Sequence, residues 1–195
     1  GVIVGGGRFV LTAGHLFRDR PGVGDSHGKI VLTTGQLIDV DLYHMEYDSS
    51  KGMDLAILKI ETAPVSVPPV EMAEARVGQT VFTLGYIESF GLGRDGTIQE
   101  NMPISDTANN YLEPLVQVGR IQSISERIVI KPVVGCAALV GLSGAPVLDE
   151  GGRLVGIFVD LNRRRDREGE EYTMHAVPVI TGREVPVLSL IGQQH

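Results

Sequence analysis

Short apolar runs alternate with glycine-rich or polar turns along almost the whole chain of 195 residues. Between positions 37 and 43 the alternation is strict, with mostly polar residues separating Ile38, Val40 and Leu42. A period of two predicts a strand with one buried face. No helical periodicity occurs before the last fifteen residues, and 25 glycines and 10 prolines are spread among the runs. The pattern therefore predicts an all-β fold, a barrel or a sandwich.

The strand pattern stops once and then restarts. Residues 67–75 contain two prolines and no periodicity, which is typical of a connector. We therefore expect an N-terminal half over residues 1–66, a C-terminal half over residues 76–180, and a short helix and tail over residues 181–195. Residues 96–114 are polar and too long for an ordinary connection, so they are interpreted as an insertion.

Charge and cysteine content exclude several classes of protein. The net charge is -7 and the estimated pI is 5.2, so a nucleic-acid binder, which needs a positive face, is not expected. Residues 163–171 are rich in arginine, but interleaved acids indicate the solvated tip of a hairpin rather than a phosphate site. Cys136 is the only cysteine, which excludes an intramolecular disulfide. No apolar run reaches membrane-spanning length, and nothing indicates the compartment or the oligomeric state.

A glycine-rich turn around Ser143 lies between two apolar runs. Serine is a weak nucleophile that needs a base for its proton and donors for the oxyanion that forms. Because Gly141 and Gly144 have no side chains, the backbone can turn tightly and aim the amides of Gly141 and Ser143 at one spot, an oxyanion hole. The alternative interpretation is an ordinary hairpin turn whose serine bonds its own backbone.

Two further residues with suitable chemistry stand at strand ends. His15 follows an expected strand over residues 8–12, where small residues allow the chain to turn and project the imidazole. Asp54 opens an apolar strand over residues 54–60, and a carboxylate half-buried there needs a polar partner such as an imidazole N–H. A turn-capping role for this aspartate remains open. The other aspartates that compete for the same role are Asp39, Asp41 and Asp48.

The order histidine, aspartate, serine is one of the few used for a catalytic triad. With residues 11–15, 54–58 and 141–146 as the three motifs, the chain resembles the trypsin-like serine peptidases, and within them the HtrA-like branch. The resemblance implies a chymotrypsin-like fold of two packed antiparallel β-barrels with a short C-terminal helix. Relative to that fold, we expect the chain to open at the second strand of the N-terminal barrel, with the first strand missing, removed or supplied by sequence not shown.

The resemblance also implies roles for individual residues. Ser143 would be the nucleophile, His15 the general base and then acid, Asp54 the orienting carboxylate, and the amides of Gly141 and Ser143 the oxyanion hole. Substrates would be proteins or peptides, with no cofactor and no metal. Leu142 replaces the aspartate of trypsin-like zymogens, so activation by a new amino terminus is not expected. The residues implied to line the substrate pocket are Ala137, Leu139, Val159, Asp160, Leu161 and His175.

Two alternatives to an active serine peptidase remain. The fold could serve as a catalytically silent module that binds peptides and keeps the oxyanion turn collapsed. Alternatively Cys136 could be the nucleophile, although it lacks a following glycine and lies upstream of the better turn. The leading hypothesis is a serine endopeptidase, with a preference for small or medium aliphatic residues before the scissile bond.

Overall fold

Strands make up almost all of the regular structure, which confirms the all-β expectation. The computed structural model describes residues 1–18, 27–32, 36–48, 50–86, 91–92, 98–99, 114–133, 142–165 and 170–180. The elements are β1 (Val2–Val4), β2 (Phe9–Thr12), the short 3-10 helix η1 (Gly14–Phe17), β3 (His27–Val31), β4 (Leu37–Asp48), β5 (Met53–Ile60), β6 (Thr80–Tyr86), β7 (Gly91–Leu92), β8 (Ile98–Gln99), β9 (Pro114–Ile124), β10 (Ile128–Pro132), β11 (Pro146–Asp149), β12 (Leu154–Arg165) and β13 (Glu170–Pro178).

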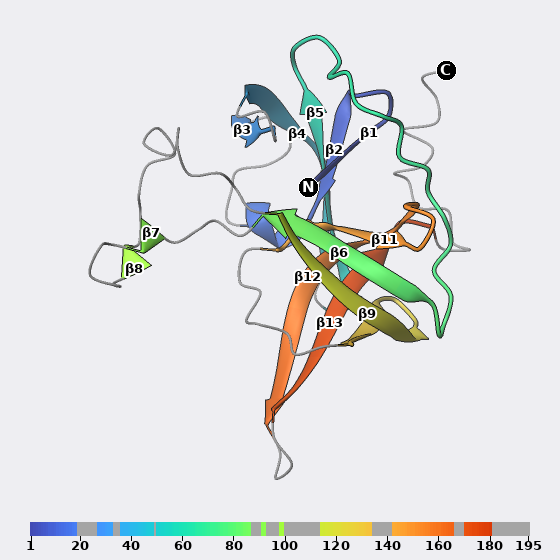
Figure 1. Ribbon diagram of the computed structural model, residues 1–195. Coiled ribbons are helices and arrows are strands. Elements are labelled where there is room, and N and C mark those ends of the chain that lie inside the picture. Colours follow the sequence, from blue (N-terminus) through green and yellow to red (C-terminus); the bar gives the residue numbers. More distant parts are fainter. Residues whose placement is uncertain are drawn as a thin grey trace.

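The strands form two larger sheets, one from each half of the chain (Figure 1). The second is a closed antiparallel barrel in the order β10-β13-β12-β11-β6-β9, with β9 and β10 completing the circle. The first is a five-stranded antiparallel sheet in the order β1-β2-β5-β4-β3. Its edge strands β1 and β3 do not pair with each other in the described part of the chain, so one closed barrel and one open sheet stand where we expected two barrels.

The segment expected to be an insertion lies largely outside the described residues, and the helix and tail expected over residues 181–195 lie wholly outside them. β7, which precedes the first of these regions, and β8, which lies within it, pair antiparallel as a small separate sheet that Figure 1 shows apart from the two larger ones.

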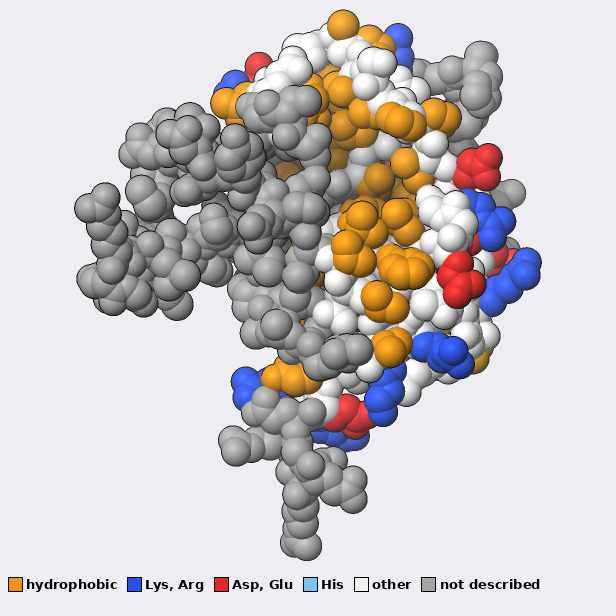
Figure 2. Space-filling model, viewed as in Figure 1, with side chains coloured by type: hydrophobic (Ala, Val, Ile, Leu, Met, Phe, Trp, Pro, Cys, Tyr) orange, Lys and Arg blue, Asp and Glu red, His pale blue; other side chains and the backbone are white. Residues whose placement is uncertain are grey.

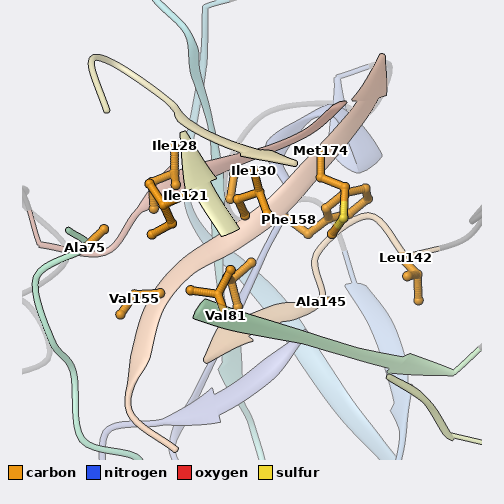
Figure 3. Packing of buried hydrophobic residues seen from close by; sticks show 12 residues of the cluster. Ala75, Val81, Ile121, Ile128, Ile130, Leu142, Ala145, Val155, Phe158 and Met174 are labelled. Atoms are coloured by element: carbon orange, nitrogen blue, oxygen red, sulfur yellow. The ribbon is translucent and has the colours of Figure 1, made fainter. Parts of the chain in front are cut away.

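The barrel is filled by apolar side chains from nearly all of its strands. Figure 3 shows Ile121, Ile128 and Ile130 grouped on one side of the interior and Phe158 beside Met174 on another. All five are at most 2% exposed. Burial on this scale, at about 25 cal/mol per Å² of apolar surface, is the main source of the stability of the barrel.

A separate apolar cluster joins the two halves. Leu11 and Ile57 from the first sheet pack with Leu154, Ile157 and Val179 from the second half. The connector follows the start of β12, because the Leu154 amide donates to the carbonyl of residue 71 at 2.7 Å and its carbonyl accepts from the amide of residue 73 at 2.9 Å. β2 and β5 are therefore held against the start of β12, where β2 leads to His15 and β5 carries Asp54.

On the face seen in Figure 2, apolar side chains form a band across the middle of the molecule, and positive and negative side chains are interleaved along its margin. Within the described residues, no helix is long and apolar enough to cross a membrane.

Candidate active site

His15 lies on η1, directly after β2 ends. Gly14 fits closely against the start of β5, since a Cβ atom there would lie 3.0 Å from the backbone nitrogen of Leu55 and 3.0 Å from the carbonyl oxygen of Glu46. The absence of a side chain at position 14 thus allows η1 to contact β5 beside Asp54. The imidazole remains partly accessible, with 27% of the side chain exposed, whereas the Asp54 side chain is 6% exposed.

Asp54 binds His15 through both carboxylate oxygens. Oδ1 accepts a hydrogen bond from the His15 backbone amide at 2.8 Å, and Oδ2 lies 2.8 Å from His15 Nδ1. An ionised carboxylate can only accept, so in the neutral imidazole the proton is assigned to Nδ1. The lone pair is then on Nε2, the atom that a general base needs.

The competing aspartates have other partners. On the outer face of the first sheet, Asp39 pairs with Lys29 and Asp41 with His27. Asp48 caps the β4–β5 turn, where its Oδ1 accepts from the Ser50 amide at 3.0 Å and from the Ser50 hydroxyl at 2.6 Å. Of these aspartates, only Asp54 contacts His15 in the described part of the chain.

Ser143 lies in a tight turn that is fixed to β12. The Gly144 amide donates to the Phe158 carbonyl at 2.8 Å, and the Phe158 amide donates to the Ala145 carbonyl at 2.8 Å. Within the turn the Ala145 amide donates to the Leu142 carbonyl at 2.8 Å, and Gly144 has a φ of 88° that favours glycine. Leu142 is 1% exposed and packs in the barrel core, which explains an apolar residue at this position.

The serine turn and the histidine turn are in contact. A Cβ atom on Gly144 would overlap the Thr12 hydroxyl oxygen and would lie 3.2 Å from the Ala13 backbone nitrogen. Gly144 is adjacent to Ser143, and Thr12 is three residues before His15. The fold thus brings all three expected triad residues to one junction between the sheets. Gly141, the other expected oxyanion donor, lies outside the described residues.

The residues expected to line a substrate pocket fall into different environments. Val159 is buried in a cluster with Ala13 and Val177, whereas Leu161 packs against the barrel core. A register shift between Phe158 and Asp160 makes a β-bulge at Val159, and bulges redirect the side chains that follow them. Ala137 and Leu139, and also Cys136, lie outside the described residues.

Asp160 is exposed and faces His175 as its cross-strand partner. Partial burial lowers the pKa of His175; the positive charge of Arg127 acts in the same direction, and the negative charge of Asp160 opposes both. These two polar residues therefore form a neighbouring pair on β12 and β13. Because Met174 and Ala176, on either side of His175, both pack in the barrel core, His175 points away from that core.

Two contacts between the halves near the expected site residues were not anticipated from the sequence. One is the close approach of Gly144 to Thr12, and the other is a hydrogen bond from Arg127 Nε to the Gly52 carbonyl at 3.1 Å. The glycine motif predicts a turn at Gly144 but not its contact with Thr12. Nothing in the sequence around Arg127 predicts a hydrogen bond to Gly52. No group of histidine, cysteine, aspartate and glutamate side chains suited to a metal ion occurs within the described part of the chain.

Comparison with known proteins identifies the family. Residues 1–157 match the sequence profile of the trypsin-like peptidase domain. The chain belongs to the trypsin-like peptidase family. No curated protein matches it. The match confirms the resemblance to trypsin-like peptidases that the three motifs indicated.

Solved structures agree on the fold. The apo MamO protease domain from Magnetospirillum magneticum is 19% identical with a TM-score of 0.55, and the match covers 100% of this chain and 86% of that one. The serine protease of a human pathogenic astrovirus is 13% identical with a TM-score of 0.59, and the match covers 92% of this chain and 83% of the astrovirus chain. At these identities the likeness shows the fold alone, and the fold is chymotrypsin-like, as expected.

Proposed function

We propose that the protein is a serine endopeptidase that uses Ser143 as nucleophile, His15 as base and Asp54 as orienting acid. The observation that carries this proposal is the two-point contact between Asp54 and His15, with both distances 2.8 Å. It fixes the imidazole and leaves Nε2 as an acceptor at the junction where the Ser143 turn contacts the histidine turn. Two solved proteins of the same fold, the MamO protease domain and the astrovirus serine protease, support the reaction class.

The proposed reaction proceeds in two halves. Ser143 Oγ attacks the peptide carbonyl carbon while His15 Nε2 takes the hydroxyl proton, and the carbonyl electrons move onto oxygen. As the tetrahedral intermediate collapses, the C–N bond breaks and the amine leaves with the proton from His15. Water then attacks the acyl-enzyme by the same route and releases the acid. The oxyanion donors in this proposal are the amides of Gly141 and Ser143, in an HtrA-like arrangement.

The test is labelling with a fluorophosphonate together with cleavage of an unstructured protein. Wild-type protein should be labelled and should cleave, whereas Ser143→Ala should do neither, with a loss of cleavage of roughly a thousandfold or more. Cys136→Ser should retain both activities. Equal peptide binding by wild type and Ser143→Ala without cleavage by either would instead support a silent binding module.

We further propose that the residue before the scissile bond is small or medium and aliphatic. Leu161 on β12 shares the apolar barrel cluster with Phe158, Met174 and Ala176, so this side of the β12–β13 pair is apolar. Asp160 and His175, which are paired across β12 and β13, are not members of that cluster, because successive residues of a strand point to opposite faces.

Cleavage of a mixed peptide library by wild type and by Asp160→Asn tests this preference. We expect the same aliphatic preference in both proteins. Dominant cleavage after arginine or lysine that disappears in Asp160→Asn would contradict the proposal.

A further inference from the structure

The hairpin turn that precedes Asp54 is held by two sets of contacts. On its own side, Asp48 caps the turn and accepts hydrogen bonds from Ser50 and from the Lys51 amide, the latter at 3.3 Å. Gly52 follows with a φ of 71°, two residues before Asp54, and is buried. The capping bonds determine the shape of the turn, but they lie within the first sheet and do not fix its position relative to the barrel.

The second contact comes from the barrel. Arg127, in the β9–β10 turn, donates from Nε to the Gly52 carbonyl at 3.1 Å, and the contact is partly buried. The side chains of the β9–β10 turn lie close to the Gly52 backbone, since a Cβ atom on Gly52 would lie 3.1 Å from Glu126 Cβ and 3.4 Å from Arg127 Cγ. The two turns therefore fit against each other, and the arginine bond completes the contact.

This contact and the contact of Gly144 with Thr12 connect the two halves at different points around His15 and Asp54. One fixes the serine turn against the strand that leads to His15. The other fixes the barrel against the turn that leads to Asp54. We propose that Arg127 is a positioning residue that sets the Asp54–His15 pair relative to Ser143, an inference that rests on the proposed serine peptidase function.

Arg127 has a second property that the test must separate from the first. Its positive charge acts on His175, so removal of the whole side chain changes both the hydrogen bond and the local field. Glutamine carries an N–H donor at the same chain position as arginine Nε but has no charge, whereas lysine keeps the charge and has a methylene at that position. The pair Arg127→Gln and Arg127→Lys therefore distinguishes the bond from the charge.

The first measurement is peptide cleavage. If the bond positions the pair, Arg127→Lys and Arg127→Met should lower kcat by about tenfold, the effect of one lost hydrogen bond on a geometry-dependent step, with KM changed by less than about twofold. Arg127→Gln should keep kcat within about threefold of wild type. Arg120→Ala, on the exposed side of β9 in the same barrel, is the matched control and should leave both constants unchanged.

The second measurement does not depend on activity. The proton on His15 Nδ1, observed by NMR, should be retained in Arg127→Gln and should be weakened by faster exchange with water in Arg127→Lys. Wild-type kcat and an unchanged proton signal in Arg127→Lys would overturn the inference, as would loss of kcat in Arg127→Gln with retention in Arg127→Lys. If wild type neither cleaves nor labels, the peptidase proposal fails, and the proton signal still decides whether Arg127 positions the pair.

Discussion

Asp54 differs from the other aspartates of the first sheet in burial as well as in partner. Its side chain is 6% exposed, while that of Asp39 is 63% exposed and is paired with Lys29 across the strand. An exposed ion pair contributes little to stability, whereas a buried carboxylate requires its hydrogen bonds. The two bonds to His15 meet that requirement and at the same time orient the imidazole, so one contact stabilises the fold and prepares the proposed base.

Asp54→Asn is expected to leave the fold intact and to lower kcat by about ten-thousandfold. The amide can donate to His15, which favours the imidazole tautomer with the proton on the wrong nitrogen for a base. Cleavage of a chromogenic peptide measures the effect, and circular dichroism checks the fold. Asp39→Asn is the matched control and should have wild-type kcat; a loss of less than tenfold in Asp54→Asn would contradict the assigned role.

The pairing of His15 with Asp54 could be predicted because each stands at a strand end, and a buried acid needs a donor. The environment of Asp160 and Leu161 could not be predicted from the sequence. It depends on the β-bulge at Val159, which shifts the alternation of β12 by one residue. Nothing in a run of apolar residues marks where a strand will bulge, so the sequence could name these residues but not the side each would face.

The serine turn is the element on which the site depends most. It is bonded to β12 through Phe158, anchored in the core by Leu142 and placed against Thr12 by the missing side chain of Gly144. The sequence motif predicted a tight glycine turn, but it explained Gly144 only by the shape of that turn. Gly144 is required for its positive φ and also for the close approach of the two halves of the protein.

Gly144→Ala is expected to reduce both stability and cleavage. A Cβ atom there would overlap the Thr12 hydroxyl, so the serine turn or the histidine strand must move. Gly78→Ala is a matched control, because Gly78 has a similar φ of 85° but no atom within 4 Å of an added Cβ. Each change should cost about 1–3 kcal/mol through backbone strain, but only Gly144→Ala should lower kcat, by at least about a hundredfold. Equal kcat values in the two variants would show that the contact is not needed.

Charged residues 163–171 illustrate a different limit of the sequence analysis. We expected a solvated hairpin tip, and β12 and β13 do form a hairpin here, with β12 continuing to Arg165 and β13 beginning at Glu170. In the register of these strands Arg163 lies opposite Tyr172 and Arg164 opposite Glu171, and Glu171 Oε1 also lies 3.0 Å from Lys131 Nζ on β10. A run of mixed charges shows no alternation of apolar and polar residues, so the sequence does not predict how far the two strands extend toward the tip.

The turn between β11 and β12 contains a buried acid that gives stability a specific pH dependence. Burial by itself would raise the pKa of the Asp149 carboxyl, but hydrogen bonds from the Arg153 side chain and from the amides of Arg153 and Gly151 outweigh it and hold the pKa below its usual 3.8. Because the folded-state pKa is the lower one, this contribution to stability is complete above the unfolded value near 4 and is lost as pH falls through the folded value.

Asp149→Asn should therefore lower Tm at pH 6 to 7, and the difference from wild type should shrink as pH falls below about 4. Thermal unfolding followed by circular dichroism across this range measures both effects. Asp39→Asn, at an exposed position, should differ little from wild type at any pH. A difference between wild type and Asp149→Asn that stays constant down to pH 2 would show that the carboxylate charge is not what stabilises the turn.

The proposed site is a property of how the halves meet. His15 and Asp54 belong to the first sheet and Ser143 to the barrel, so no half contains a complete triad. The order of the motifs along the sequence was sufficient to predict this division. The surface that joins the halves was not predictable, because its members are ordinary apolar strand residues whose partners lie about 100 or more positions away, such as Leu11 and Ile157.

Ile157 tests whether this interface positions the site. It is fully buried against Leu11 and Ile57 and precedes Phe158, the residue bonded to the serine turn. Ile130 is equally buried but packs only within the barrel, which makes it the matched control. Truncation of either residue to alanine should cost about 2–5 kcal/mol of unfolding free energy.

At a temperature where both variants are fully folded, Ile157→Ala should lower kcat by about tenfold or more, because the cavity lies between the halves and allows the serine turn to shift relative to His15. Ile130→Ala should keep kcat within about twofold of wild type. Denaturant unfolding and peptide cleavage, measured on the same preparations, separate stability from geometry. An equal loss of kcat in both variants, or in neither, would mean that the interface supports the fold without setting the distance between the proposed nucleophile and its base.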